Sequence, residues 1–290
     1  MRTAQLTLAV GRLAENFYDR RIHFMGDYLN SNRQLWNKWT PLHEQSLAYK
    51  VAEFKSGGST LRPVEHNELK NVAGKTLLHL QCHFGLDTLS WAREGADVVG
   101  VDLSDESINL ARSLSSELDI PATFICSELL DLPNVLTRQF DIVFTSYGVL
   151  NWLSDLKGWA DVIAHFLKPD GIFYIVEFHP FSNIFDSDSP ELKVANQYFF
   201  SEEPFRFEMQ GSYAAETNET VYGYNWKHSL SDIFNALIGA GLQIESFNEF
   251  PFTLRERISG MVQGEDDLWR LTKQNGMVPF LFSLQARKVN

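Results

Sequence analysis

Two short stretches combine polar side chains with the ends of apolar runs. Residues 77–85 read LLHLQCHFG, so a strand-like run would lead into Gln81, Cys82, His83 and Gly85. A loop that leaves a strand and enters a helix places backbone N–H groups and the positive helix end beside one point, which suits a polar or anionic cofactor group. A glycine there lets the backbone approach a ligand closely. The stretch is therefore a candidate nucleotide-binding loop, with a buried strand running into an ordinary turn as the alternative.

Asp102 supplies the second half of this pattern. It closes VVGVD, the next strand-like run along the chain. A carboxylate at the end of a second strand can accept hydrogen bonds from both hydroxyls of a ribose. Loop and carboxylate together predict a cofactor that contains an adenosine.

The elements that must position these residues alternate in type. From Lys75 onward, short β-branched runs alternate with stretches whose apolar residues recur at helical spacing. This alternation predicts an α/β fold with a doubly wound, mostly parallel sheet and helices on both faces. A later helix over 228–241 and two further strands would complete a seven-stranded sheet. The predicted strands cover residues 76–81, 97–103, 122–127, 140–146, 171–178, 242–250 and 278–288, and helices at 86–96, 106–118 and 156–168 connect the first five.

Two long segments interrupt this rhythm. Residues 1–70 read as an aromatic-rich N-terminal helical arm, and residues 181–227 as an insertion that carries a few extended segments. A further connection, 252–277, is predicted to hold a short helix around residues 266–272. Long connections inside a compact domain are usually lids or binding elements, so the arm and the insertion are expected to shape a pocket. The core would comprise residues 71–180 and 228–290.

This core resembles the class I S-adenosylmethionine (SAM)-dependent methyltransferases. The run LLHLQCHFGLDTLSWAREGADVVGVDLSDESINLAR is similar to the first two motifs of that family, and FICSELLDLP to its adenine-edge motif. FDIVFTSYGVLNWL and LKPDGIFYIVE are similar to its fourth and fifth strands. The resemblance extends from about Lys75 to Glu177 and implies a Rossmann-like methyltransferase fold with SAM as cofactor.

The loop departs from the family pattern at three positions. His79 stands where the family has an acidic residue, and Gln81 and His83 stand at its first two loop glycines. The loop resembles that of a subgroup of uncharacterised bacterial methyltransferase-like proteins with LQCHFG and a similar TPLH segment. The side chains of Gln81 and His83 would then bond the methionine carboxylate or ammonium, and His79 would orient them. The predicted cofactor site comprises His79, Gln81, Cys82, His83, Gly85, Asp102, Leu103, Glu128, Leu129, Ser146 and Tyr147.

Several of these assignments have structural alternatives. Glu128 follows the third strand and could bind the adenine amino group or the ribose, or it could cap a helix, with Asp131 as a nearby competitor. Ser146 and Tyr147 follow the fourth strand, where open parallel sheets bind ligands, but they could equally be turn residues. In the N-terminal arm, Trp36, Trp39, Tyr49 and Phe54 could close over a sulfonium or simply pack on the sheet.

A general base is needed only if the methyl acceptor must lose a proton. His179, at the end of the fifth strand in VEFHP, is a candidate base, and Tyr147 is a second catalytic candidate. The alternative for His179 is a histidine held by its neighbours at the Pro180 turn. Weaker candidates of the same kind are Glu177, His43 and His228.

Composition excludes several other classes of function. The chain has 25 Lys and Arg against 37 Asp and Glu, a net charge of −12, and no basic run, so nucleic acid and anionic membranes are disfavoured as partners. No window is apolar over a length that spans a bilayer. Two cysteines, Cys82 and Cys126, fit reduced thiols and a cytoplasmic location. A metal at His79, Cys82 and His83 would lack a fourth ligand, so no metal is predicted.

The sequence therefore predicts a methyltransferase that acts on a small molecule, as a monomer or homodimer, with the acceptor atom left open. A non-catalytic protein that binds SAM or S-adenosylhomocysteine (SAH), as a sensor or scaffold, is the main alternative because the loop lacks two glycines. A nicotinamide-dependent oxidoreductase could use a similar sheet, but G-x-G-x-x-G is absent.

Overall fold

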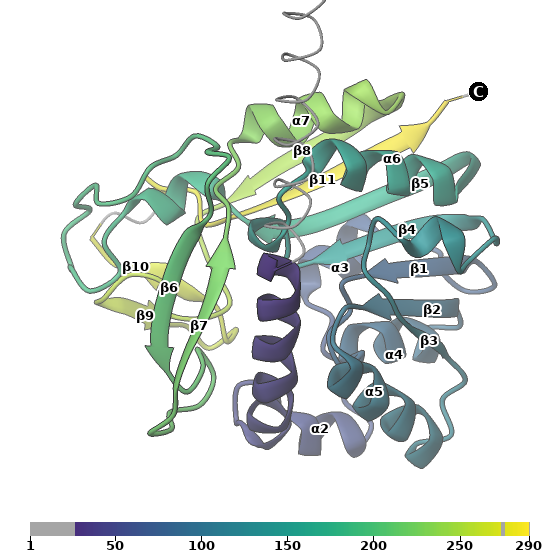
Figure 1. The fold of residues 1–290 in the computed structure, drawn as a ribbon, viewed down its shortest axis with the longest axis horizontal. Helices are drawn as coiled ribbons and strands as arrows, with labels where there is room; N and C mark the ends of the chain where they lie inside the picture. The colour runs from purple at the N-terminus through teal and green to yellow at the C-terminus, as the bar shows by residue number, and fades with distance from the viewer. Residues whose placement is uncertain (1–26, 274–275, 290) are drawn as a thin grey trace, which may run out of the picture.

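The computed structural model describes residues 27–273 and 276–289 (Figure 1). The first 26 residues of the predicted N-terminal arm lie outside the described residues. In the described ranges, no helix has the length and apolar character needed to cross a bilayer.

A seven-stranded sheet forms the centre of the structure and confirms the predicted fold class. The strand order is β3-β2-β1-β4-β5-β11-β8, in which the first five are parallel and β11 runs antiparallel to both of its neighbours. Because β1 pairs with β2 on one side and β4 on the other, the strand order reverses there, and open sheets bind ligands at such a point. The strands are β1 (Thr76–Leu80), β2 (Asp97–Asp102), β3 (Thr123–Cys126), β4 (Phe140–Ser146), β5 (Leu167–Phe178), β8 (Leu242–Phe250) and β11 (Leu281–Lys288).

Helices cover both faces of the sheet because successive strand residues point to opposite sides. Leu78 packs in one cluster with Trp159 and Leu237, whereas Leu77 packs in another with Trp91. Figure 1 shows α6 and α7 on one side of the sheet, with α4 and α5 on the other. The helices are α4 (Leu86–Arg93), α5 (Asp105–Glu117), α6 (Leu156–Phe166) and α7 (Leu230–Gly239).

Polar side chains fix where these helices begin. The side chain of Ser104 accepts a hydrogen bond from the Ser107 amide at the start of α5, and Asp155 does the same for Gly158 in α6. Short elements fill the connections: α2 (Val51–Lys55), α3 (Pro63–Glu68), and the 3-10 turns η1 (Leu132–Asn134), η2 (Leu150–Trp152) and η3 (Pro180–Ile184).

The two long segments pack against each other beside the sheet. A helix covers residues 27–45, and the insertion forms an antiparallel hairpin of β6 (Phe205–Gln210) and β7 (Thr220–Asn225). Asn32 exchanges two hydrogen bonds of 2.9 Å with the backbone of Tyr224, so the helix is tied to β7. Figure 1 shows this helix, in purple, beside the hairpin.

The predicted short helix around residues 266–272 is wrong. The segment forms a hairpin of β9 (Met261–Gln263) and β10 (Trp269–Leu271). Asp267 adopts a left-handed conformation with φ 62°, and the Gly264 amide donates to the Leu268 carbonyl at 2.9 Å. Since a left-handed residue cannot continue a right-handed helix, this turn reverses the chain.

Candidate functional site

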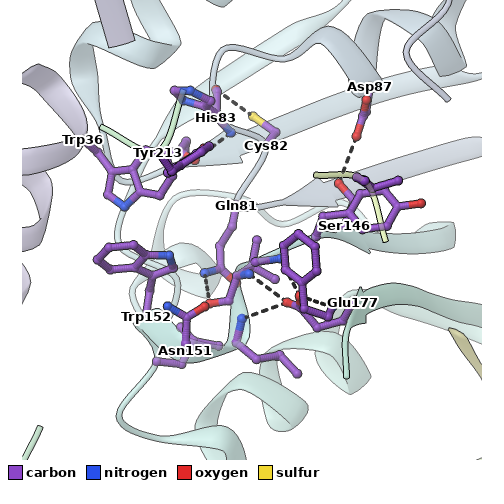
Figure 2. Close-up of a pocket in the computed structure, with 18 of the residues that line it drawn as sticks. Trp36, Gln81, Cys82, His83, Asp87, Ser146, Asn151, Trp152, Glu177 and Tyr213 are labelled. Atoms are coloured by element: carbon purple, nitrogen blue, oxygen red, sulfur yellow. Dashed lines mark hydrogen bonds between the residues drawn. The ribbon is translucent and has the colours of Figure 1, made fainter. Parts of the chain in front are cut away.

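A cavity of about 700 Å³ opens at the carboxyl ends of the parallel strands. Its lining comes from the loops after β1, β2, β3 and β4 and from the helix over 27–45. The insertion over 181–227 and the connection over 252–277 supply the rest. In Figure 2, Trp36 and Trp152 lie to one side of Gln81, and Asp87 and Ser146 lie to the other. The predicted cofactor residues and the predicted pocket-shaping segments therefore share one cavity.

The loop after β1 keeps a glycine-like backbone at positions that have lost glycine. Gln81, His83 and Gly85 all have positive φ, at 57°, 52° and 78°. A Cβ atom on Gly85 would lie 2.6 Å from the Phe124 ring, which explains why glycine is required there. At the other two positions the left-handed conformation costs about 1–2 kcal/mol each, and the surroundings must stabilise it.

His83 is stabilised by bonds to two helices. Its Nδ1 lies 2.9 Å from the Ser107 hydroxyl in α5, and its Nε2 lies 2.9 Å from Nδ1 of His43 in the helix over 27–45. Burial holds the pKa of His83 well below its usual range, so the ring is neutral. Both ring nitrogens are thus taken up by the protein, and the side chain ties the loop to its neighbours.

Gln81 has one free polar atom. Its Nε2 donates to the Val149 carbonyl at 3.2 Å, while its Oε1 is buried without a hydrogen-bond partner among the described residues. A buried acceptor without a donor costs about 1–3 kcal/mol, so this atom suits a donor on a bound molecule.

Asp102 holds the loop and keeps capacity for a ligand. Its two oxygens accept from the His83 amide at 2.8 Å and from the Ser104 amide at 2.9 Å. A carboxylate offers about four acceptor positions, so acceptor capacity remains for a ligand hydroxyl. Burial raises the pKa of Asp102 to about 6, and the group is mostly ionised at neutral pH.

A carboxylate that sequence reasoning missed lies at the other end of the loop. Asp87, in the first turn of α4, accepts from the Ser146 hydroxyl at 3.0 Å and from the Thr60 hydroxyl at 2.6 Å. Beside it, burial lowers the pKa of His79 to about 4, and His79 Nδ1 lies 2.8 Å from the Thr88 hydroxyl. An acid in a first helical turn is common, so the sequence alone gave Asp87 no functional signal.

The other predicted cofactor residues also line the cavity. Glu128 is half-buried, and its Oε2 accepts from the Asp131 amide at 3.1 Å. One of its oxygens therefore caps the following turn, as the alternative assignment expects. Burial raises the pKa of Glu128. The remaining lining residues of this set are Cys82, Leu103, Leu129, Ser146 and Tyr147.

The two catalytic candidates differ in position. His179 is buried outside the cavity lining, with Nδ1 accepting from the Phe181 amide at 3.1 Å and Nε2 lying 2.8 Å from the Glu249 carboxylate. Tyr147 does line the cavity, and its buried hydroxyl makes no hydrogen bond of ordinary geometry with a described residue. Burial and the neighbouring Glu65 raise the pKa of Tyr147 well above its usual range.

The weaker candidates have structural partners. Glu177 accepts from the amides of Val149 at 2.8 Å and Leu150 at 3.2 Å, and so fixes the turn after β4 (Figure 2). The Nε2 atom of His228 lies 2.7 Å from the Leu153 carbonyl. Within the described residues, no three His, Cys, Asp or Glu side chains are arranged to hold a metal ion.

Residues 78–175 match the model of a protein family described as "Methyltransferase domain". The core of the chain is thus similar to a methyltransferase domain. The chain is 32% identical over 100 residues to the ubiquinone biosynthesis O-methyltransferase of Photorhabdus laumondii, a match that covers 34% of this chain and 41% of that protein. The match to the ubiquinone biosynthesis O-methyltransferase of Proteus mirabilis, at 27% identity, covers 47% of this chain and 62% of that protein. The chain thus spans about half the length of the curated relatives it matches.

Solved structures share the fold of this chain. An S-adenosylmethionine-dependent methyltransferase from Mesorhizobium loti has a TM-score of 0.53 at 18% identity, over 80% of this chain and 99% of that one. The DhpI–SAH complex has a TM-score of 0.55 at 15% identity, over 90% of this chain and 97% of that one. At such identities the likeness shows the fold alone.

Proposed function

We propose that this protein is a SAM-dependent methyltransferase that methylates a small-molecule acceptor. The observation that carries the proposal is a single cavity in which Asp102, Gln81 and the Gly85 turn meet the walls formed by the arm and the insertion. The match of the core to a methyltransferase domain and the small-molecule activity in the names of its relatives support it.

The side chains on the loop edge of the cavity fit the groups of SAM. Asp102 keeps acceptor capacity for the ribose hydroxyls, and Gln81 Oε1 is an unpaired acceptor for the ammonium group. Asp87 supplies a carboxylate at the end of the loop where His79 replaces the acid that the family resemblance would place there. Glu128 is proposed to contact the adenine edge or the ribose.

Bound SAM would supply a methyl group on a sulfonium, which is already a good leaving group. The protein's own contribution is then orientation of the acceptor and exclusion of water. Trp36 and Trp152 lie edge to face with ring centroids 5.3 Å apart on the cavity wall, and aromatic faces stabilise a nearby cation. Tyr147 would bound the acceptor with its ring, because its hydroxyl is buried beside Glu65.

A role for His179 as general base stays a prediction that its surroundings disfavour. Its ring nitrogens already face the Phe181 amide and Glu249. Membership of the LQCHFG subgroup, a cytoplasmic location and a monomeric or homodimeric state are further parts of the proposal. The left-handed angles of the loop support a variant loop, and the free thiols of Cys82 and Cys126 support a reducing compartment.

A non-catalytic SAM- or SAH-binding protein is the second candidate. The observation that favours it is the loss of two loop glycines together with the commitment of the His83 side chain to protein partners. A nicotinamide-dependent oxidoreductase is not proposed, because the core matches a methyltransferase domain.

Calorimetric titration of the purified protein with SAM and with SAH tests the proposal. We expect micromolar binding of both, followed by SAH release when SAM and small acceptors are supplied together. Binding without turnover over a broad acceptor panel would favour the sensor or scaffold. Failure of both molecules to bind would refute the proposal.

A further inference from the structure

Three cationic side chains line the cavity on the side formed by the insertion (181–227) and the connection over 252–277. Lys227 follows β7, and Arg255 and Arg257 lie between β8 and β9. None of the three was singled out by its sequence context, because each stands in a segment without a motif. All three are half-buried rather than exposed.

Aromatic rings hold the two guanidinium groups in place. The Arg257 guanidinium lies 4.4 Å from the centroid of the Phe178 ring, and that of Arg255 lies 5.7 Å from the same ring and 4.8 Å from the Tyr213 ring. Arg257 also donates to the side-chain oxygen of Asn183. Stacked guanidinium groups keep their N–H donors free at the edge, where a planar or tetrahedral anion can bind.

The positive charge of these three side chains is not paired with a carboxylate of the described residues at ion-pair distance. Among the described residues, no carboxylate lies within 4.0 Å of the cationic nitrogens of Lys227, Arg255 or Arg257. Burial and the charge of Arg255 lower the pKa of Arg257 to about 9, and burial and Arg257 lower the pKa of Lys227. Glu177 is the acid that raises the pKa of Arg257, yet its oxygens already accept backbone amide bonds.

We propose that Lys227, Arg255 and Arg257 bind an anionic group, a carboxylate or phosphoryl group, on the methyl acceptor. This deepens the proposed function and rests on it. Charges withdrawn from water are stabilised by a counter-ion, and the cavity is open to a molecule that brings one. The chain as a whole is acidic, at −12, so its overall field repels anions and this local cluster must supply the attraction.

The position of the cluster fits an acceptor that bridges to the cofactor side. The Phe178 ring that carries both guanidinium groups lies 6.1 Å from the Tyr147 ring, centroid to centroid. Tyr147 in turn precedes the turn Gly148–Leu150 that Gln81 and Glu177 hold in place. The arginines and the loop after β1 therefore line the same cavity.

Binding of a matched probe series tests the proposal without knowledge of the natural acceptor. Phenyl phosphate, benzoate and the neutral benzamide are titrated calorimetrically into the wild-type protein, with and without saturating SAH. We expect both anions to bind and benzamide not to, with phenyl phosphate tighter if the natural group is phosphoryl and benzoate tighter if it is a carboxylate. Arg257→Gln should weaken anion binding by about tenfold or more, because a partly desolvated charge pair is lost.

The control is Arg206→Gln, which removes an exposed arginine of β6 that pairs with Glu208 outside the cavity. It should leave anion affinity unchanged, and neither variant should alter SAM affinity. If Arg257→Gln does not fold, Lys227→Gln gives the same comparison.

Benzamide binding as tightly as benzoate, or equal anion affinity in wild type and the cavity variant, would overturn the anion site. Absence of binding by both anions would do so as well. Loss of SAM and SAH binding with Arg257-dependent anion binding retained would instead refute the methyltransferase proposal, so the two failures are distinguishable.

Discussion

Replacement of Gln81 by glycine should raise stability and lower affinity for SAM. The residue has φ 57°, and its buried Oε1 has no partner among the described residues. Both features lower the stability of the unliganded protein. The unpaired Oε1 is also the atom that we propose to contact the cofactor. The two measurements should therefore move in opposite directions in the Gln81→Gly variant.

The expected change in the free energy of unfolding is the sum of four contributions, less a correction for lost packing. Relief of the left-handed conformation contributes about 1–2 kcal/mol, and the greater chain entropy of glycine offsets about 0.5–1 kcal/mol of it. Removal of the unpaired oxygen contributes about 1–3 kcal/mol, against about 0.5–1.5 kcal/mol for the lost hydrogen bond to the Val149 carbonyl. Allowing for lost packing, the net gain is about 1 kcal/mol, or about 2–3 °C in Tm. Loss of a hydrogen bond to the SAM ammonium, about 1.5–3 kcal/mol, should weaken binding by about ten- to a hundredfold.

Thermal unfolding without ligand and calorimetric titration with SAM measure the two effects. Gln81→Ala is the matched control, since it removes the amide but keeps a Cβ on a left-handed backbone. It should lose as much SAM affinity as Gln81→Gly and be less stable than it by about 1 kcal/mol. Equal stability of the two variants would refute the strain argument, and unchanged SAM affinity in both would refute the cofactor contact.

Three further perturbations address other parts of the site. Asp102→Ala should weaken SAM binding by more than about tenfold. The SAM affinity of the wild-type protein should fall as the pH drops through the Asp102 pKa of about 6. Calorimetric titration at pH 5 and 7.5 checks this, and equal affinity at both pH values contradicts it. Burial raises the pKa of Glu65 to about 8 from 4.5, so the folded state keeps a proton that the unfolded state releases, and stability should fall as pH rises between these values. Urea unfolding of Glu65→Gln should show a flatter pH profile, and parallel profiles would remove Glu65 as the cause. Tyr147→Ala should lower turnover by about tenfold and more than His179→Ala does, because only the Tyr147 ring lines the cavity; the reverse order would favour His179.

The sheet could be predicted from the sequence because local signals and topology agree. Runs such as VVGVD and FDIVFTS are bounded by turn residues, and the helices between them begin at capping residues such as Ser104 and Asp155. Since parallel strands place their carboxyl ends at one edge, Asp102 and Ser146 could be assigned to one site without coordinates. The structure brings both to the same cavity.

The rest of the site depends on contacts that no local pattern reports. The predicted helix around 266–272 failed because a left-handed Asp267 and a turn bond outweighed helical spacing. The partners of His83, in two different helices, come together only in the fold. Arg255 and Arg257 both lie over the ring of Phe178, which is far away in the chain, so no local pattern identifies them. The division into arm, core and insertion stays a prediction, although the hydrogen bonds of Asn32 to Tyr224 join two of these parts.

The bonds of His83 also couple this loop to two distant parts of the chain. A histidine at that position is held in its left-handed conformation by His43 from the arm and Ser107 from α5. A change of glycine to histidine in a chain without those two partners would leave a strained residue with unpaired ring nitrogens. His83, His43 and Ser107 are therefore energetically coupled, so that substitution of one of them should change the effect of substituting another.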